Sequence, residues 1–338
     1  MDPSAYLPPI IEAEYTAAHP GLTDDARALL RAEVRTDPGK YAQTDRTRAL
    51  VAYAAARSRL VRGYNAISDL PDEEFEPKRE RLFADARASL HAVLEQDRRC
   101  VEARLLDILL GGRTYDDCVR DMLALERETC DYLLESLPGF DPEAPVLVPA
   151  DAPVAVPDPV VVGWLHTVES LSQCCIATAR YRAGERYARI VLSAAGYPNR
   201  AEGTLFLALA RLEDEEGFFS AVEHCRDKLG RDVEASPWFL LSRALLFYKL
   251  GKYKQARRAV KDFATRCDGG AYFLGSPVFP APYLPVRPEP RESWDESQQA
   301  VFEADGILID TPDFVQWATS IAEVAQAAEE FGRRTGYM

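Results

Sequence analysis

The chain has 338 residues, with 40 Lys and Arg against 54 Asp and Glu, and a formal net charge of −14 at pH 7. Apolar residues make up 47% and charged residues 28%, which is typical of a folded globular protein and not of a disordered chain. The acidic balance argues against non-specific binding to nucleic acid, which needs clustered Lys and Arg. The length allows one large domain or two ordinary ones.

The N-terminal segment and the cysteines indicate a cytoplasmic protein. The segment lacks the basic start and the uninterrupted apolar stretch of a secretory signal, and it carries Asp2, Glu12 and Glu14. The seven cysteines are odd in number, and none stands in a CxxC pair, so a reducing compartment is expected. The stretch Pro159–Ala179 is long enough to span a bilayer, at roughly 20 residues, but its polar residues favour a buried bundle helix. No membrane partner is therefore predicted.

Apolar residues recur at three- and four-residue steps through most of the chain, which is the helical period. The first half is expected to form helices over Asp24–Val34, Thr44–Ile67, Glu73–Glu95, Val101–Leu109 and Tyr115–Leu137. The second half is expected to form helices over Val160–Arg180, Gly184–Ala195, Ala201–Glu213, Phe218–Lys228, Pro237–Leu250, Tyr253–Arg266, Ser293–Ala304 and Pro312–Phe331. Only the short run Gly306–Asp310 has the pattern of a strand. An all-helical protein built from antiparallel helix pairs is predicted.

Two proline-rich segments interrupt the helical pattern. Pro138–Pro159 holds seven of the 23 prolines and is expected to be extended or polyproline II. Cys267–Pro290 holds six more, together with aromatic residues that are too apolar for a solvated linker. The second segment is therefore expected to pack against the helices.

A 34-residue period runs through the second half, where Gly217 matches Gly251 and Ala210 matches Ala244. The stretch ALLFYKLGKYKQARRAVKDF resembles the tetratricopeptide family. Its small, aromatic, glycine, aromatic and alanine positions are filled by Ala244, Phe247, Gly251, Tyr253 and Ala256. The resemblance implies helix pairs stacked as a superhelix, and it implies an interaction scaffold with a concave groove. The chain then divides into an N-terminal helical region (1–137), a linker (138–159), tetratricopeptide-like repeats (160–267), and a proline-rich loop with capping helices (268–338).

The region after the last repeat resembles the end of the suppressor-of-tumorigenicity-7 family. Tyr272-Phe273-Leu274 occupies the position of that family's aromatic step, and the prolines come next. Ser297-Gln298-Gln299-Ala300 and a helix with Trp317 then follow. Where that family has Asn-Pro, this chain has Asp268-Gly269-Gly270. The resemblance implies no catalytic residue, since the family has no active site to transfer.

No constellation of residues singles out an enzyme. The four histidines stand in no metal-binding spacing, and neighbours such as His224 and Cys225 point about 100° apart on a helix. No nucleophile elbow occurs, and Gly111-Gly112 lacks the lysine of a phosphate-binding loop. The basic run KYKQARRAVK fits the exposed side of the last repeat helix better than a nucleic acid site. We therefore expect no catalytic residue, no metal and no cofactor.

The resembled repeats bind partners with the first helix of each pair. Mapped onto this chain, the groove is expected at Gln173, Ala177, Arg180, Leu207, Arg211, Asp214, Trp238, Leu241, Leu245 and Tyr248. The mixture of polar and aromatic residues suits a protein or peptide with an apolar anchor. Alternatively, Trp238 and Tyr248 are core residues beneath the segment Gly269–Pro290, and the groove is closed.

Three functions follow in order of preference. The first is a non-enzymatic scaffold that binds a protein or peptide through the concave groove. The second is a regulatory module that senses a small molecule held between the repeats and the proline-rich loop. A hydrolase or transferase on a helical framework is the third.

Overall fold

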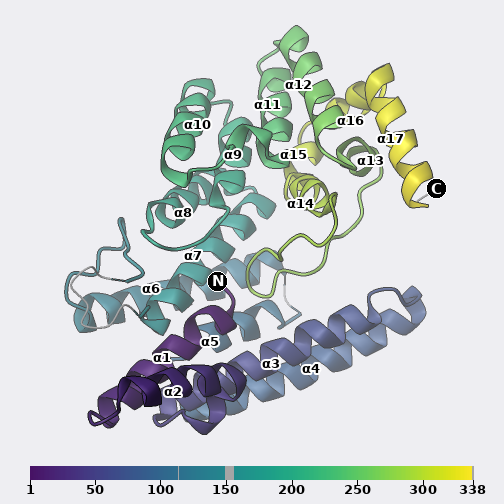
Figure 1. Cartoon of the computed structure of the whole chain (residues 1–338). Helices are drawn as coiled ribbons and strands as arrows, with labels where there is room; N and C mark the ends of the chain where they lie inside the picture. The colour runs from purple at the N-terminus through teal and green to yellow at the C-terminus, as the bar shows by residue number, and fades with distance from the viewer. Residues whose placement is uncertain (113, 149–155, 337–338) are drawn as a thin grey trace. The chain divides into compact units, whose positions relative to one another are not determined.

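The computed structural model describes residues 1–112, 114–148 and 156–336 (Figure 1). These residues form 17 α-helices and no β-strand, so the predicted all-helical class is confirmed for this part of the chain. Val146 and Ala195 form an isolated bridge between two loops. Residues 149–155, which belong to the first proline-rich segment, lie outside the described residues. The polyproline conformation expected for them stays a prediction.

The chain forms two compact units. Unit 1 comprises Met1–Thr167, Ser193–Pro198 and Leu284–Val286. Unit 2 comprises Val168–Leu192, Asn199–Tyr283 and Arg287–Met338. The boundary therefore falls inside one helix, Pro159–Ala177, and short returns of the chain complete unit 1. The four sequence regions divided at residues 138–159 and 267 remain a prediction.

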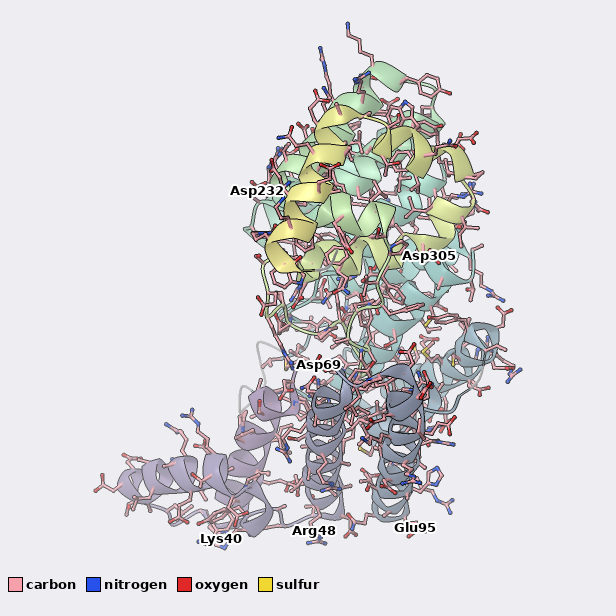
Figure 2. All side chains as sticks on the ribbon, turned by 90° about the vertical axis from the view of Figure 1, so that its right-hand side faces the viewer. Lys40, Arg48, Asp69, Glu95, Asp232 and Asp305 are labelled. Carbon is pink, nitrogen blue, oxygen red and sulfur yellow. The ribbon has the colours of Figure 1, made fainter. Side chains whose placement is uncertain are left out.

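Unit 1 is built around a long antiparallel helix pair, α3 and α4. Figure 2 shows Arg48 and Glu95 at one end of this pair and Asp69 at the other. Tyr53, Leu60 and Leu90 are almost completely buried between the helices. The helices of this unit are α1 (Pro3–Ala18), α2 (Asp24–Thr36), α3 (Asp45–Ile67), α4 (Asp72–Gln96), α5 (Val101–Leu109) and α6 (Tyr115–Ser136), with a 3-10 turn η1 (Pro38–Lys40).

Apolar periodicity predicts no helix in the first 23 residues, where α1 forms. Pro8 and Pro9 inside the segment remove backbone donors and normally argue against a helix. The start is nevertheless well formed, because Pro3 occupies the first turn and the Asp2 carboxylate accepts from the Ser4 N–H at 2.9 Å. The buried apolar face of α1, which includes Ile11, offsets the lost bonds.

Unit 2 continues as a series of helix pairs followed by shorter helices. The remaining helices are α7 (Pro159–Ala177), α8 (Tyr181–Ser193), α9 (Ala201–Arg211), α10 (Glu215–Leu229), α11 (Pro237–Lys249), α12 (Tyr253–Arg266), α13 (Gly270–Gly275), α14 (Asp295–Glu303), α15 (Asp305–Ile309), α16 (Pro312–Thr319) and α17 (Ala322–Thr335), with a 3-10 turn η2 (Val233–Ala235). In Figure 1, α9 and α11 lie side by side, with α14 next to α11. The first helix of each pair is the more buried, and Ala201–Ala210 of α9 are buried without exception.

The three helix pairs of this series share one turn geometry. Three residues separate α7 from α8, α9 from α10 and α11 from α12, and the middle one is left-handed: Ala179 (φ 58°), Glu213 (φ 59°) and Gly251 (φ 70°). The third turn residue donates to a carbonyl five residues back in each case: Arg180 to Cys175 at 2.7 Å, Asp214 to Leu209 at 3.1 Å and Lys252 to Phe247 at 2.8 Å. This is the Schellman pattern, which satisfies carbonyls at a helix end.

The turn geometry corrects the repeat register. Gly251 corresponds in structure to Glu213, and the match between Gly217 and Gly251 is wrong. Gly217 lies in the first turn of α10, where its N–H donates to the Asp214 carboxylate at 2.8 Å. The first two turns are 34 positions apart and the last two are 38 apart. The difference arises because α10 has 15 residues against 13 in α8, and α11 has 13 against 11 in α9.

Three further expectations for the C-terminal region are wrong in detail. The expected strand Gly306–Asp310 is the helix α15, in which the neighbours Ile307 and Leu308 are both buried. The expected helix Pro312–Phe331 is two helices, because Ile321 is extended (φ −79°, ψ 122°) and the Ser320 hydroxyl competes for the Trp317 carbonyl at 2.7 Å. The second proline-rich segment also contains the short helix α13.

Helix α7 is long and apolar enough to cross a membrane by composition. In this structure 83% of its most apolar 18-residue window is buried. Asp158 caps the start of this helix, since its carboxylate accepts from the Val160 N–H at 2.7 Å.

Candidate functional site

The expected groove lies on the first helices of the pairs in unit 2, and its apolar members are buried. Trp238 is 3% exposed, and Leu207, Leu241 and Leu245 are completely buried. Packing between α9 and α11 is close at this point, because a Cβ on Gly203 would lie 2.6 Å from the Trp238 ring. Only glycine fits beside the indole. These four side chains belong to the core of unit 2.

Trp238 is covered by Arg287 and Glu303. The Arg287 guanidinium lies 4.5 Å from the centre of the indole ring, and the indole N–H donates to Glu303 Oε2 at 3.0 Å. A cation above an aromatic face is an attractive arrangement, and it is stronger away from water. Trp238 is therefore a core residue, as the second of the two alternative predictions has it. Arg287 comes from the proline-rich segment, as expected, but Glu303 comes from α14.

Arg287 and Glu303 form a buried ion pair, with side chains 2% and 7% exposed. Two Arg287 nitrogens donate to the carboxylate at 2.7 and 2.8 Å, and the Tyr283 hydroxyl donates to it at 2.6 Å. Arg287 also donates to the Arg200 carbonyl at 2.7 Å, at the start of α9. The nearby negative charge of Glu303 raises the pKa of Arg287 although burial acts to lower it. This pair, with Trp238 and Tyr283, is called the Glu303 cluster below.

Tyr248 is half-buried and is covered by α16 and not by the proline-rich segment. Its ring centre lies 5.2 Å from that of Phe314 and 4.9 Å from that of Trp317. On its other side Tyr253 makes an edge contact at 5.4 Å, and Tyr253 itself is 57% exposed. Tyr248 thus joins an aromatic group that reaches the surface.

The polar residues of the expected groove have different structural roles. Arg211 pairs at 3.0 Å with Asp310, which directly follows α15, and stacks on Tyr181 at 5.1 Å. Asp214 caps α10, and Gln173 is half-buried. Ala177 and Arg180 are exposed at the end of α7 and in the following turn. The ten residues do not form one open surface, because the chain's own α14, α15 and α16 contact the first helices of the pairs.

A second buried polar group lies in unit 1 and was not singled out from the sequence. Glu102 of α5 is 1% exposed and accepts from the Tyr6 hydroxyl of α1 at 2.8 Å and the Tyr53 hydroxyl of α3 at 2.9 Å. His166 Nδ1 of α7 lies 3.1 Å from Glu102 Oε2. One carboxylate therefore connects four helices, and the four residues are called the Glu102 cluster below. The sequence signal that could have identified this cluster is the acidic Glu102 among the apolar residues of α5.

The electrostatics of Glu102 favour its charged form. Burial acts to raise its pKa, but the adjacent His166 ring and the hydrogen bonds from the two tyrosines lower the pKa to about 2. Burial raises the pKa of the adjacent Cys100 thiol to about 12, which is opposite to the shift that activates a cysteine nucleophile. With all these side chains buried, the cluster joins helices and presents no reactive atom to solvent.

No group of three or more His, Cys, Asp and Glu side chains among the described residues is placed to hold a metal ion. Comparison with known protein families, with curated proteins and with solved structures finds no match for this chain.

Proposed function

We propose that this chain is a non-catalytic, cytoplasmic scaffold with tetratricopeptide-like repeats, and that it binds another protein or a peptide. The observation that supports this proposal most strongly is the recurring turn at Ala179, Glu213 and Gly251, with the same backbone hydrogen bonds each time. Repeated helix pairs stack on their neighbours and present extended surfaces to partners. The seven free thiols fit a reducing compartment.

The proposal changes the expected mode of binding. A partner cannot contact Leu207, Trp238, Leu241 or Leu245, because these side chains are buried, with α14 packed on α11 and α16 packed on Tyr248. The covering segment follows the last helix pair, where the suppressor-of-tumorigenicity-7 family places its proline loop and tryptophan helix. We therefore propose that this segment is a built-in occupant of the groove, and that partners bind the exposed second helices.

The proposal is tested by affinity capture from the source lysate with the immobilised full chain, followed by quantitative mass spectrometry. We expect at least one protein to be enriched over a heat-unfolded sample of the same chain. Chemical crosslinks should place that protein on α8, α10 or α12. The absence of any enriched protein in repeated captures, at low and physiological salt, would contradict the scaffold function.

The small-molecule sensor remains a hypothesis that no observed contact favours. Its expected site lies between the repeats and the proline-rich segment, where Arg287 already stacks on Trp238 and bonds to the Arg200 carbonyl. A metabolite that raises the melting temperature of the wild type, but not of an Arg287→Met variant, would favour the sensor over the scaffold.

A further inference from the structure

Helix α12 carries a concentration of positive charge on an acidic chain. It contains five basic residues and one acidic residue, whereas the whole chain has a net charge of −14. Its buried side is formed by Ala256, Ala259, Val260 and Phe263. At about 100° per residue, Lys254, Arg257, Arg258 and Lys261 fall within an arc of roughly 100° on the opposite side. The four cations therefore share one face.

This basic face is only partly neutralised by the protein itself. Lys261 pairs with Glu323 of α17, and Arg257 acts on the same carboxylate. Lys254 and Arg258 are exposed, and neither has an ion-pair partner among the residues described by the structure. Surface cations that are left without anions attract acidic partners and steer their approach.

An ordered aromatic residue borders the cations. Tyr253 stands one helical turn before Arg257 and is 57% exposed. Its ring is supported by Tyr248, which in turn packs on Trp317. A supported, exposed tyrosine loses little conformational entropy on binding, and tyrosine is enriched among the residues that carry binding energy.

We propose that this face of α12, defined by Tyr253, Lys254, Arg257 and Arg258, binds an acidic peptide segment of a partner protein that carries an apolar side chain. The arginines and the lysine would pair with carboxylates of the segment, and Tyr253 would contact its apolar residue. From Lys254 to Lys261 the face extends about 10 Å, which matches roughly three residues of extended chain. This proposal rests on the scaffold function and names the chemistry of its partner.

The charge pattern favours a peptide over a nucleic acid. A long polyanion would meet the negative field of the rest of the chain, because its phosphates extend well beyond a 10 Å face, about one Debye length at 0.1 M salt. A short acidic segment can neutralise the face without approaching the acidic remainder. The aromatic residue adds an apolar contact that a plain phosphate backbone does not need.

The test is fluorescence anisotropy with the full chain and a labelled synthetic peptide of glutamates with one phenylalanine and one leucine. We expect saturable binding that weakens as salt is raised. The double variant Lys254→Glu/Arg258→Glu should lose at least about tenfold in affinity, and Tyr253→Ala should lose several-fold. The matched control is Arg81→Glu/Arg98→Glu, which makes the same change in net charge at exposed positions of unit 1 and should bind as the wild type does.

Absence of saturable binding to the wild type, or equal losses in the α12 and control variants, would overturn the proposal. Tighter binding of a single-stranded RNA or of phosphatidylserine vesicles through the same residues would also overturn it. Because the lysate capture is independent of this peptide, a partner that is captured equally by the wild type and the α12 variant would leave the scaffold function standing and refute only this site.

Discussion

Each unit contains a buried glutamate that holds distant segments together, and the two glutamates have different partners. Glu102 receives hydrogen bonds from two neutral tyrosines and lies beside an imidazole. Glu303 faces the guanidinium of Arg287, which stays charged at every accessible pH. Loss of the Glu102 carboxylate leaves hydroxyl groups and an imidazole, none of which carries an obligatory charge. Loss of the Glu303 carboxylate leaves the buried Arg287 cation without a counter-ion.

The largest expected effect is therefore the loss of the Glu303 carboxylate. The variant Glu303→Ala should lower the free energy of unfolding by about 3–5 kcal/mol, because Arg287 would remain buried without its counter-ion. Urea denaturation followed by circular dichroism measures this cost. The double variant Arg287→Met/Glu303→Leu should recover a large part of it, since apolar residues of similar volume replace both charges. A double variant less stable than Glu303→Ala would contradict this explanation.

Removal of the indole beneath this ion pair tests whether Trp238 is core. The variant Trp238→Ala should lower the free energy of unfolding by at least about 3 kcal/mol, because it leaves a cavity beside Gly203. Trp238→Phe keeps most of the volume and loses the hydrogen bond to Glu303, so it should cost about 1 kcal/mol. An alanine variant with unchanged stability would indicate an exposed groove residue.

Loss of the carboxylate in unit 1 should cost less than the loss in unit 2. Glu102→Ala leaves two buried hydroxyls without their acceptor and removes the carboxylate beside His166, and we expect a destabilisation of about 2–3 kcal/mol. Urea denaturation under the conditions used for Glu303→Ala makes the values comparable. A cost for Glu102→Ala above that for Glu303→Ala would refute the proposed difference between the clusters.

The lowered pKa of Glu102 also predicts how the free energy of unfolding depends on pH. The pKa of Glu102 is about 2 in the folded chain, against 4.5 for an unperturbed glutamate, so its charge stabilises the fold above pH 4.5. This contribution should be lost as the pH falls from 4.5 towards 2. Urea midpoints measured across this range should fall more steeply for the wild type than for Glu102→Gln. Parallel curves would show that Glu102 does not titrate with unfolding.

The smallest effects are expected in the repeated turns, which lie outside both clusters. Ala179 and Glu213 are left-handed without being glycine, so Ala179→Gly and Glu213→Gly should each raise the free energy of unfolding by about 1 kcal/mol. Gly251→Ala should lower it by a similar amount. Melting temperatures of the three variants check these signs, and a destabilised Ala179→Gly would contradict the shared turn geometry.

Local signals in the sequence were sufficient for most helices and insufficient for the contacts between them. Periodicity located α5 and α12 at their observed bounds, Val101–Leu109 and Tyr253–Arg266. Periodicity did not predict α1, because Pro8 and Pro9 argue against a helix although the segment has a buried apolar face. Glycine spacing misplaced a repeat turn, because in this chain Ala179 and Glu213 adopt the conformation that usually requires glycine.

The candidate site was harder to predict because it depends on long-range contacts. The sequence predicted a groove on the first helices of the pairs, but it did not indicate that α14 packs on α11 and that α16 packs on Tyr248. Tyr6 and Tyr53 lie 96 and 49 positions from Glu102, and no local pattern relates such distant residues. Whether a tryptophan at a groove position is open or covered depends on what the rest of the chain places there.

The central claim is that the first helices of the three pairs are covered by the chain's own C-terminal segment. Hydrogen exchange of the native full chain, read by mass spectrometry, tests it most directly at α14 (Asp295–Glu303). The structure predicts that amides of α14 exchange about as slowly as those of α11 (Pro237–Lys249), because Glu303 is tied to Trp238 and Arg287. Rapid exchange throughout α14, with α11 still protected, would show that the segment is detached and that the groove is open.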